Sequence, residues 1–493
     1  MELFDRSLAN NLKLNNWAEN EVGATFKHGL KVKQSALGGY GIFFDSRCIP
    51  KESQNYEILR IPARSVLSLE TCREIMRSCK QNKTSTLLFI QQCLRQYCSE
   101  APVVSESYIL VAYCVAFLVL KRLSRLDDLQ SSSIGFVQQY LDVLIETKVY
   151  NLNNDDINLL IEYVNEFPGN TLIQEVVYRL KDGGSAKFAK YVNEELLKGK
   201  HYGIISDNDV IQIITAVRSR ELEIPHDCFN ANDEEGSNFT VGIKLVPILD
   251  FANHDNGQVN AYFDLDRSNN DVLLKLDTKC FKQQGGQVHE VFISYNPVEE
   301  ISRFFVTYGF IPRSVNSRWS FVDVPFWGHF KASAANGTDL LNPNVLFAIK
   351  FGVDRRIDDV RICLTNKKEV VSAIRKMMKG DSNTILEKDA LTSFVKIVRD
   401  GLAERAEKLN RYKTWTSGQK IGKGRSKNIC ELVEFGVEMA KKFTAMCEKE
   451  TQKETLGNYL ALVMEARNDH EVSIWDNLRL IPDFNEKEEH TEG

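Results

Sequence analysis

The sequence predicts an α+β fold in which β-rich material is split by a helical insertion and followed by a helical region. Two observations carry this prediction. Short runs rich in Ile, Phe, Val and Tyr, broken by glycine and proline, occur in two separate parts of the 493 residues. Between these parts, and again toward the C-terminus, apolar residues recur every three or four positions, which is the spacing of an amphipathic helix.

The first β-rich segment runs from about Gly29 to Leu69, and we assign residues 1–69 to the first part of the β-rich domain. Its apolar runs are interrupted by Gly38, Gly39, Gly41, Pro50 and Pro62. Glycine and proline at such close spacing are typical of turns between short strands. We therefore expect several short strands here.

The helical insertion is predicted over residues 70–220, where "VQQYLDVLIETK", "LIQEVVYRLKD" and "FAKYVNEELLKG" carry the helical spacing. The apolar run Tyr108–Leu120 is shorter than the ~20 residues that a membrane-spanning helix needs. It therefore indicates a helix buried in the protein, and we expect no membrane partner.

Strand-like composition returns from Val241 to Pro312, and residues 221–318 are predicted as the second part of the β-rich domain. Residues 319–485 are predicted as an all-α domain, and residues 486–493 as an acidic, disordered tail. The basic stretch at residues 419–428 lacks the spacing of a phosphate-binding loop. It is interpreted as a solvated loop between helices, with contact to an acidic partner as the alternative.

Composition favours an intracellular protein without a metal. The net charge of −5 argues against general binding to nucleic acid or membranes. The eleven cysteines form no C-x-x-C pair and the eight histidines no H-x-x-x-H pair, so we expect reduced thiols and no metal site. The N-terminus has no apolar stretch like that of a secretory signal. We expect a monomer in the cytoplasm, with the nucleus as an additional location.

One polar cluster interrupts apolar surroundings in "LVPILDFANHDNGQVNAYF", residues 245–263. Asp250, Asn253, His254 and Asp255 follow an apolar run directly. A buried polar group costs about 1–3 kcal/mol unless it finds a partner. Such a cluster is therefore either a turn whose polar groups pair with one another or a ligand site.

Together with "SALGGYGIFF" (residues 35–44) and "EVFISYNPVEEISRFFVTYGFIP" (residues 290–312), the motif "PILDFANHD" resembles the SET-domain protein lysine methyltransferases. The similarity is greatest to the branch of the Rubisco large-subunit methyltransferase and its fungal relatives. It implies a split SET domain, a helical insertion and a helical substrate-binding domain, in that order. Taken singly, "NH" is more often a turn, Tyr295 a strand tyrosine and "YGF" a helix end; the order of all three favours function.

The resemblance implies a role for each matching residue. The residues expected to bind S-adenosylmethionine are Gly39, Tyr40, Gly41, Arg220, Asp250, Asn253, His254 and Tyr295. Tyr295 is expected beside the transferred methyl group as the catalytic residue, while Tyr308 and Phe310 are expected to line the channel for the substrate lysine. An aromatic channel favours the neutral amine that attacks the methyl group, because burial disfavours its charged form.

The implied function is an S-adenosylmethionine-dependent protein-lysine N-methyltransferase whose substrate is a ribosomal protein or a translation factor. Two alternatives remain, a non-catalytic SET-like interaction module and a histone lysine methyltransferase. The family pattern is not complete, because Asn296 follows Tyr295 where glycine is frequent and Ile301 replaces a later asparagine. No cysteine-rich zinc motif follows Tyr308, which fits the Rubisco-type branch.

Overall fold

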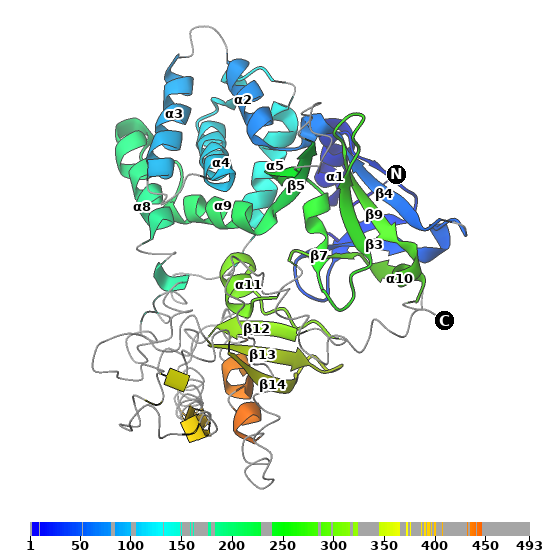
Figure 1. Cartoon of the computed structure of the whole chain (residues 1–493). Coiled ribbons are helices and arrows are strands. Elements are labelled where there is room, and N and C mark those ends of the chain that lie inside the picture. Colours follow the sequence, from blue (N-terminus) through cyan, green and yellow to red (C-terminus); the bar gives the residue numbers. More distant parts are fainter. Residues whose placement is uncertain are drawn as a thin grey trace, which may run out of the picture. The chain divides into compact units, whose positions relative to one another are not determined.

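The computed structural model describes residues 2–8, 10–51, 53–79, 84–99, 105–131, 133–147, 149, 158, 161, 176–178, 183–227, 239–283, 287–296, 299–315, 319–323, 345–364 and scattered positions between 371 and 445. The chain divides into two units (Figure 1). Unit 1 comprises Met1–Val149 and Tyr178–Tyr295, and unit 2 comprises Tyr150–Val177 and Asn296–Gly493. The tail at residues 486–493 and the basic stretch at residues 419–428 lie outside the described residues.

Unit 1 contains sheets built from both β-rich segments. An antiparallel four-stranded sheet has the order β1 (Thr25–Phe26), β4 (Asn55–Ile61), β9 (Val272–Asp277) and β8 (Ala261–Leu265). A three-stranded sheet has the order β10 (Val288–Glu290), β3 (Tyr40–Asp45) and β2 (Leu30–Gln34). Two further pairs are β11 (Phe292–Ile293) with β7 (Asn253–His254), and β5 (Glu221–Asp227) with β6 (Phe239–Leu245). Strands from before and after the helical insertion therefore pair with each other.

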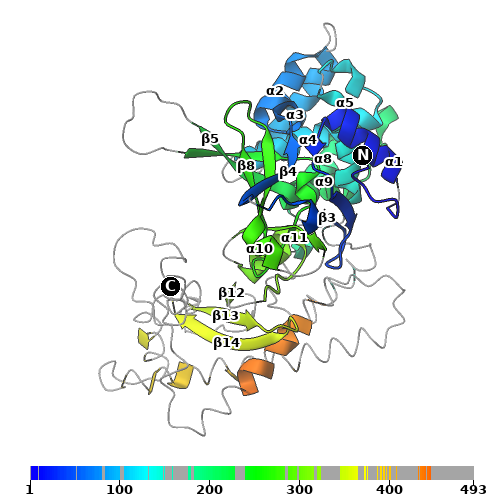
Figure 2. The ribbon, with the colours of Figure 1, turned by 90° about the vertical axis from the view of Figure 1, so that its right-hand side faces the viewer.

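In unit 1, the short helix α10 (Thr278–Gln283) follows β9. The helices of the insertion lie between the two sets of strands in the sequence and are grouped together in Figures 1 and 2. They are α2 (Leu69–Arg77), α3 (Thr84–Ser99), α4 (Glu106–Arg122), α5 (Ile134–Glu146), α8 (Gly184–Tyr191) and α9 (Asp207–Arg220); the short α1 (Asn11–Asn16) precedes the strands. Every residue from Leu110 to Leu120 in α4 is buried, which confirms the predicted buried helix. None of the helices in the described part of the chain is long and apolar enough to cross a membrane.

Helix α9 has clear signals at both ends. Ser206 caps its start in a capping box with Asp209, in which each side chain bonds the other residue's backbone N–H. The helix ends at Arg220, and Glu221 is already extended at the start of β5. This junction places the Arg220 side chain between the helical insertion and the second β-rich segment.

Unit 2 shows that the prediction of an all-α region over residues 319–485 is wrong. An antiparallel sheet joins β12 (Trp319–Asp323), β13 (Val345–Phe351) and β14 (Ile357–Leu364), after the helix α11 (Ile301–Tyr308). Three successive residues of β13, Phe347, Ala348 and Ile349, are fully buried. A strand buried on both faces has no alternating pattern, so periodicity alone does not distinguish it from a buried helix.

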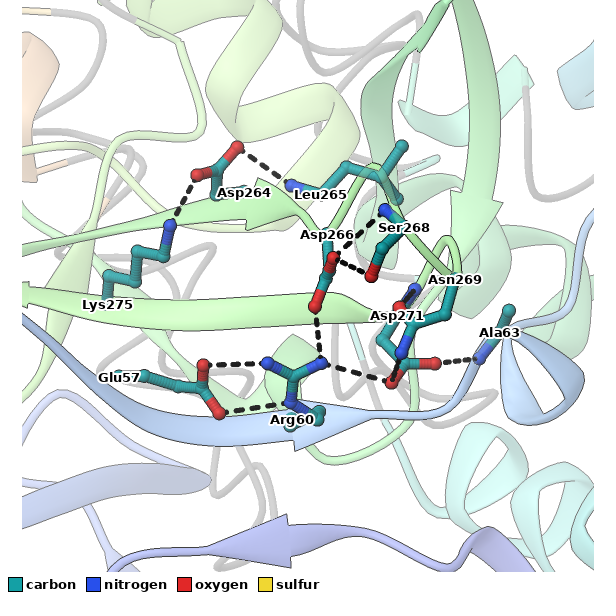
Figure 3. Close-up of polar contacts among 10 residues, drawn as sticks. All are labelled: Glu57, Arg60, Ala63, Asp264, Leu265, Asp266, Ser268, Asn269, Asp271 and Lys275. Carbon is teal, nitrogen blue, oxygen red and sulfur yellow. Dashed lines mark hydrogen bonds and ion pairs between the residues drawn. The ribbon is translucent and has the colours of Figure 1, made fainter.

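An ionic cluster ties β4 to the turn between β8 and β9 (Figure 3). Arg60 of β4 pairs with Asp266 at 2.7 Å, with Asp271 at 3.2 Å and with Glu57 at 3.0 Å. The other carboxylate oxygen of Asp271 accepts a hydrogen bond from the backbone N–H of Ala63 at 3.0 Å. One guanidinium thereby holds three carboxylates, two of them about 200 residues away in sequence.

Because of this ionic cluster, we expect the protein to lose stability in acid. The Ser268 hydroxyl and the Arg60 guanidinium lower the pKa of Asp266 to about 2. The pKa of Asp266 in the folded protein is thus lower than the value of about 3.9 for an aspartate in the unfolded chain. The ionised carboxylate therefore contributes its full stabilisation above about pH 3.9, and this contribution is lost as the pH falls through 2. We expect Asp266→Asn to be less stable than the parent at pH 5, and the difference to shrink toward pH 2. Urea unfolding across this range measures it, and a difference independent of pH would contradict it.

Candidate functional site

The chain enters the polar cluster through a strained turn in unit 1. The Leu249 N–H donates to the Pro247 carbonyl at 2.8 Å, with Ile248 between them at φ 71° and ψ −49°. This is a γ-turn with positive φ, which is rare, and a β-branched residue is unfavourable there. Ile248 is nevertheless fully buried. Strain of this kind persists where the surrounding structure enforces it, and such positions cluster at functional sites.

Asp250, the first polar residue after this turn, lies in a buried ion pair. Its Oδ2 atom is 2.9 Å from Arg220 Nη1 and accepts the Tyr140 hydroxyl at 2.7 Å. Arg220 also donates to the Asp250 carbonyl at 3.1 Å and to Thr147 Oγ1 at 2.8 Å. Burial lowers the pKa of Arg220, but Asp250 and Tyr140 raise it more, so the guanidinium stays charged. The Arg220–Asp250 ion pair thus links the end of helix α9 to the polar cluster.

Two polar atoms of this pair have no hydrogen-bond partner although they are buried, namely Asp250 Oδ1 and Arg220 Nε. The Asp250 side chain has an exposed fraction of 0%, and that of Arg220 is 14%. Leaving such atoms unpaired costs about 1–3 kcal/mol each, and more for charged groups. A ligand with a cationic and an anionic group could pair with both of these atoms.

Asn253 connects the polar cluster to the segment "SALGGYGIFF" (residues 35–44), called here the glycine-rich turn. Its Nδ2 atom donates to the Tyr40 carbonyl at 3.1 Å and to Glu290 Oε1 at 2.7 Å. A β-carbon on Gly41 would lie 2.3 Å from Glu290 Oε1 and 3.1 Å from Asn253 Nδ2. A side chain at position 41 would therefore require the Glu290 carboxylate to move. Gly39 has φ +66° and open space where a β-carbon would lie, which fits a close approach by a ligand.

Tyr295 is held against the polar cluster by its backbone and its hydroxyl. Strands β7 and β11 pair in parallel, with His254 opposite Ile293. Beyond this pairing, the Tyr295 N–H donates to His254 Nδ1 at 3.0 Å, and the Tyr295 hydroxyl donates to the Ala252 carbonyl at 2.9 Å. Since Nδ1 accepts, the proton of a neutral His254 ring is on Nε2. The two rings are 5.2 Å apart, and Tyr295 is half-buried.

Phe251 lies at the centre of these residues, and sequence reasoning missed it. Its ring is 5.5 Å from that of Tyr40, edge to face, and the Arg220 guanidinium is 5.2 Å from its centroid. The Phe251 ring thus contacts both Tyr40 of the glycine-rich turn and Arg220 of the buried ion pair. Glu290 and Tyr140 were also missed. The local signal for Phe251 was its position within D-x-x-N-H, but Tyr140 is 110 residues from Asp250 and had none.

The structure thus brings together in unit 1 all the predicted cofactor residues, while the two predicted channel residues lie in unit 2. There Tyr308 and Phe310 form an aromatic cluster with Phe304, with ring centroids 5.1 to 6.1 Å apart. Gly309 has φ 77° and ends helix α11, so this glycine does serve as a helix cap. Tyr308 and Phe310 are both half-buried.

Metal ligands do not gather in the described part of the chain. No group of three or more His, Cys, Asp or Glu side chains there could hold a metal ion. The polar residues of unit 1 instead pair with each other and with the backbone.

The chain is similar to known lysine methyltransferases. The family described as cytochrome c lysine N-methyltransferase 1 matches residues 12–340, which include every predicted site residue. Proteins of that name match from Saccharomyces cerevisiae (31% identity, 57% of this chain and 46% of the relative), Kluyveromyces lactis (32%, 61% and 58%) and Eremothecium gossypii (30%, 57% and 55%). The chain therefore spans about half the length of the curated relatives that it matches.

Proposed function

Since the chain belongs to the cytochrome c lysine N-methyltransferase 1 family, we propose that it transfers a methyl group from S-adenosylmethionine to a lysine of a cytochrome c. The observation that carries the proposal is the match over residues 12–340, within which the polar cluster, the glycine-rich turn and Tyr295 lie. The expected ribosomal or translation-factor substrate finds no support in the comparisons. Neither do the alternatives of a histone substrate and a non-catalytic module.

The residues of unit 1 fit this cofactor. When bound, S-adenosylmethionine supplies an activated methyl group on sulfur, and its methionine part carries an ammonium and a carboxylate. Asp250 Oδ1 is a buried acceptor without a partner, and Arg220 Nε is a buried donor without one. These two atoms suit the ammonium and the carboxylate respectively. We assign Gly39, Asn253 and His254 to the same site, since Asn253 and His254 are joined to the glycine-rich turn and to Tyr295.

We assign to Tyr295 the task of orienting the attacking amine. Its hydroxyl proton is donated to the Ala252 carbonyl, so its oxygen acts as an acceptor toward other groups. An acceptor at this point holds an amine N–H and directs the nitrogen lone pair away from it. Free lysine has a pKa near ~10.4, so the amine must lose its proton before transfer, and an apolar surrounding favours that. The lysine-channel role that the resemblance implies for Tyr308 and Phe310, which lie in unit 2, stays a prediction.

We further propose that unit 1 is a split SET domain. The support is that strands from before and after the insertion pair directly, β4 with β9 and β3 with β10. The helices from α2 to α9 are thus inserted into one β-rich domain. A solved structure with the cofactor tests this proposal by whether the cofactor contacts both β-rich segments.

Methylation of purified substrates tests the function. The full chain is incubated with S-adenosylmethionine and, in parallel, with unmethylated cytochrome c, with histones and with ribosomal proteins, and modified lysines are located by mass spectrometry. We expect methylation of one or a few lysines of cytochrome c. Methylation confined to histones or ribosomal proteins would refute the proposed substrate. Failure to bind the cofactor would refute the activity itself.

We expect Asn253→Ala to weaken binding of S-adenosylmethionine by about tenfold, because Tyr40 and Glu290 lose the amide that holds them at the glycine-rich turn. Calorimetry on the folded variant measures this. Asn15→Ala is a matched control, since Asn15 is a buried asparagine whose amide bonds only the backbone of Leu3 and Phe4. Equal affinity of the two variants for the cofactor would remove Asn253 from the site.

A further inference from the structure

Helix α5 of the insertion holds a tyrosine whose ring is fixed independently of its hydroxyl. Tyr140 is fully buried, and its ring stacks on that of Trp17 with centroids 6.1 Å apart and planes 14° apart. Trp17 is itself anchored to the same helix, because its Nε1 donates to the Phe136 carbonyl at 3.1 Å. The position of the Tyr140 ring therefore depends on packing, and its hydroxyl is available for another task.

That hydroxyl donates to Asp250. The Tyr140 hydroxyl oxygen is 2.7 Å from Asp250 Oδ2, and Arg220 Nη1 is 2.9 Å from the same carboxylate oxygen. Burial, followed by the charge of Asp250, raises the pKa of Tyr140 well above its usual value, so the hydroxyl remains a donor. With both donors on Oδ2, the carboxylate is held in one orientation, and Oδ1 is the atom left for a ligand.

The end of helix α5 contacts the other member of the ion pair. Thr147 follows the last residue of the helix, and its Oγ1 accepts Arg220 Nη2 at 2.8 Å. Helix α5 also packs against α9, which carries Arg220 (Figure 1). The helix thus contacts Asp250 through Tyr140 and Arg220 through Thr147.

We propose that helix α5 positions the Asp250–Arg220 pair for the cofactor, with the Tyr140 hydroxyl acting on Asp250 and the Thr147 hydroxyl acting on Arg220. This inference rests on the proposed function, because it takes the unpaired atoms of the ion pair as cofactor contacts. It makes Tyr140 and Thr147 positioning residues, which act through Asp250 and Arg220 and do not touch the reacting atoms. The helical insertion then contributes directly to cofactor affinity.

Tyr140→Phe tests the inference because it removes one oxygen and keeps the stacked ring. We expect the dissociation constant of S-adenosylmethionine to rise about tenfold, as for a lost hydrogen bond to a charged group, while the rate at saturating cofactor changes by less than about threefold. Tyr97→Phe is the matched control. Tyr97 is also a buried tyrosine of the insertion, and its hydroxyl accepts Arg218 of the same helix α9 at 3.2 Å. Its loss is expected to leave the dissociation constant unchanged.

A double-mutant cycle separates positioning from general destabilisation. If Tyr140 acts through Asp250, Tyr140→Phe has no further effect on cofactor affinity in an Asp250→Asn background. Additive effects, equal effects of Tyr140→Phe and Tyr97→Phe, or parent-like affinity of Tyr140→Phe would each overturn the inference. Lack of cofactor binding by the parent chain would refute the proposed function instead.

Thr147 offers a second route if Tyr140→Phe does not fold. Thr147→Val removes the oxygen that accepts Arg220 while keeping the shape of the side chain, and Thr147→Ser retains the hydroxyl. We expect weaker cofactor binding in the first variant and near-parent binding in the second. Equal affinity of the two variants would overturn the inference.

Discussion

Tyr295→Phe is expected to lower the rate of lysine methylation by roughly 10²-fold at saturating cofactor, which corresponds to about 3 kcal/mol in activation free energy. The substitution removes a single oxygen, the one that donates to the Ala252 carbonyl at 2.9 Å. The substitution does not affect the hydrogen bond from the Tyr295 backbone N–H to His254 Nδ1. We therefore expect the fold and the cofactor affinity to change little, and the loss to appear in the chemical step.

Single-turnover methylation beside a thermal melt measures this effect. Tyr56→Phe is the control, because Tyr56 of β4 is another partly buried tyrosine that packs against the core of unit 1, with its ring 6.1 Å from Phe44. That variant is expected to methylate at the parent rate. If Tyr295→Phe melts like the parent and keeps more than about half of its rate, Tyr295 has no part in the mechanism.

Arg220→Met is expected to lower the free energy of unfolding by about 3–5 kcal/mol, because it leaves the Asp250 carboxylate buried without its cationic partner. The exposed fraction of that carboxylate side chain is 0%, so water does not replace the guanidinium. Tyr140 remains as a neutral donor to Oδ2, and it does not neutralise the charge. Denaturant unfolding of parent and variant gives the difference.

An exposed ion pair provides the comparison. Arg47 pairs with Asp45, and 64% of the Arg47 side chain is exposed, so Arg47→Met is expected to cost less than about 1 kcal/mol. An additional Asp250→Leu replacement in the Arg220→Met variant is expected to recover part of its stability, since it removes the unpaired charge. Similar losses for Arg220→Met and Arg47→Met would show that the buried pair does not stabilise unit 1.

Much of the local structure could be predicted from short stretches of sequence. The apolar run Tyr108–Leu120 is long enough to indicate a helix, and its lack of a polar face indicates burial, as α4 shows. Gly39 marks a turn, and its φ of +66° would strain a residue with a side chain. The error over residues 319–364 has a physical cause as well, because a strand as buried as β13 loses the alternation that identifies strands.

By itself, the sequence determined where the polar cluster lies, which side chains it offers and that helices separate the two β-rich segments. Only the tertiary structure decided which distant residues complete the site: Tyr140 reaches Asp250 across 110 residues, and Glu290 reaches Asn253 across 37. The physical reason is that helix and strand patterns depend on neighbours a few positions apart. Contacts between distant segments depend instead on how elements such as helix α5 and strand β10 pack in the folded unit. The local periodicity of the sequence does not predict that packing.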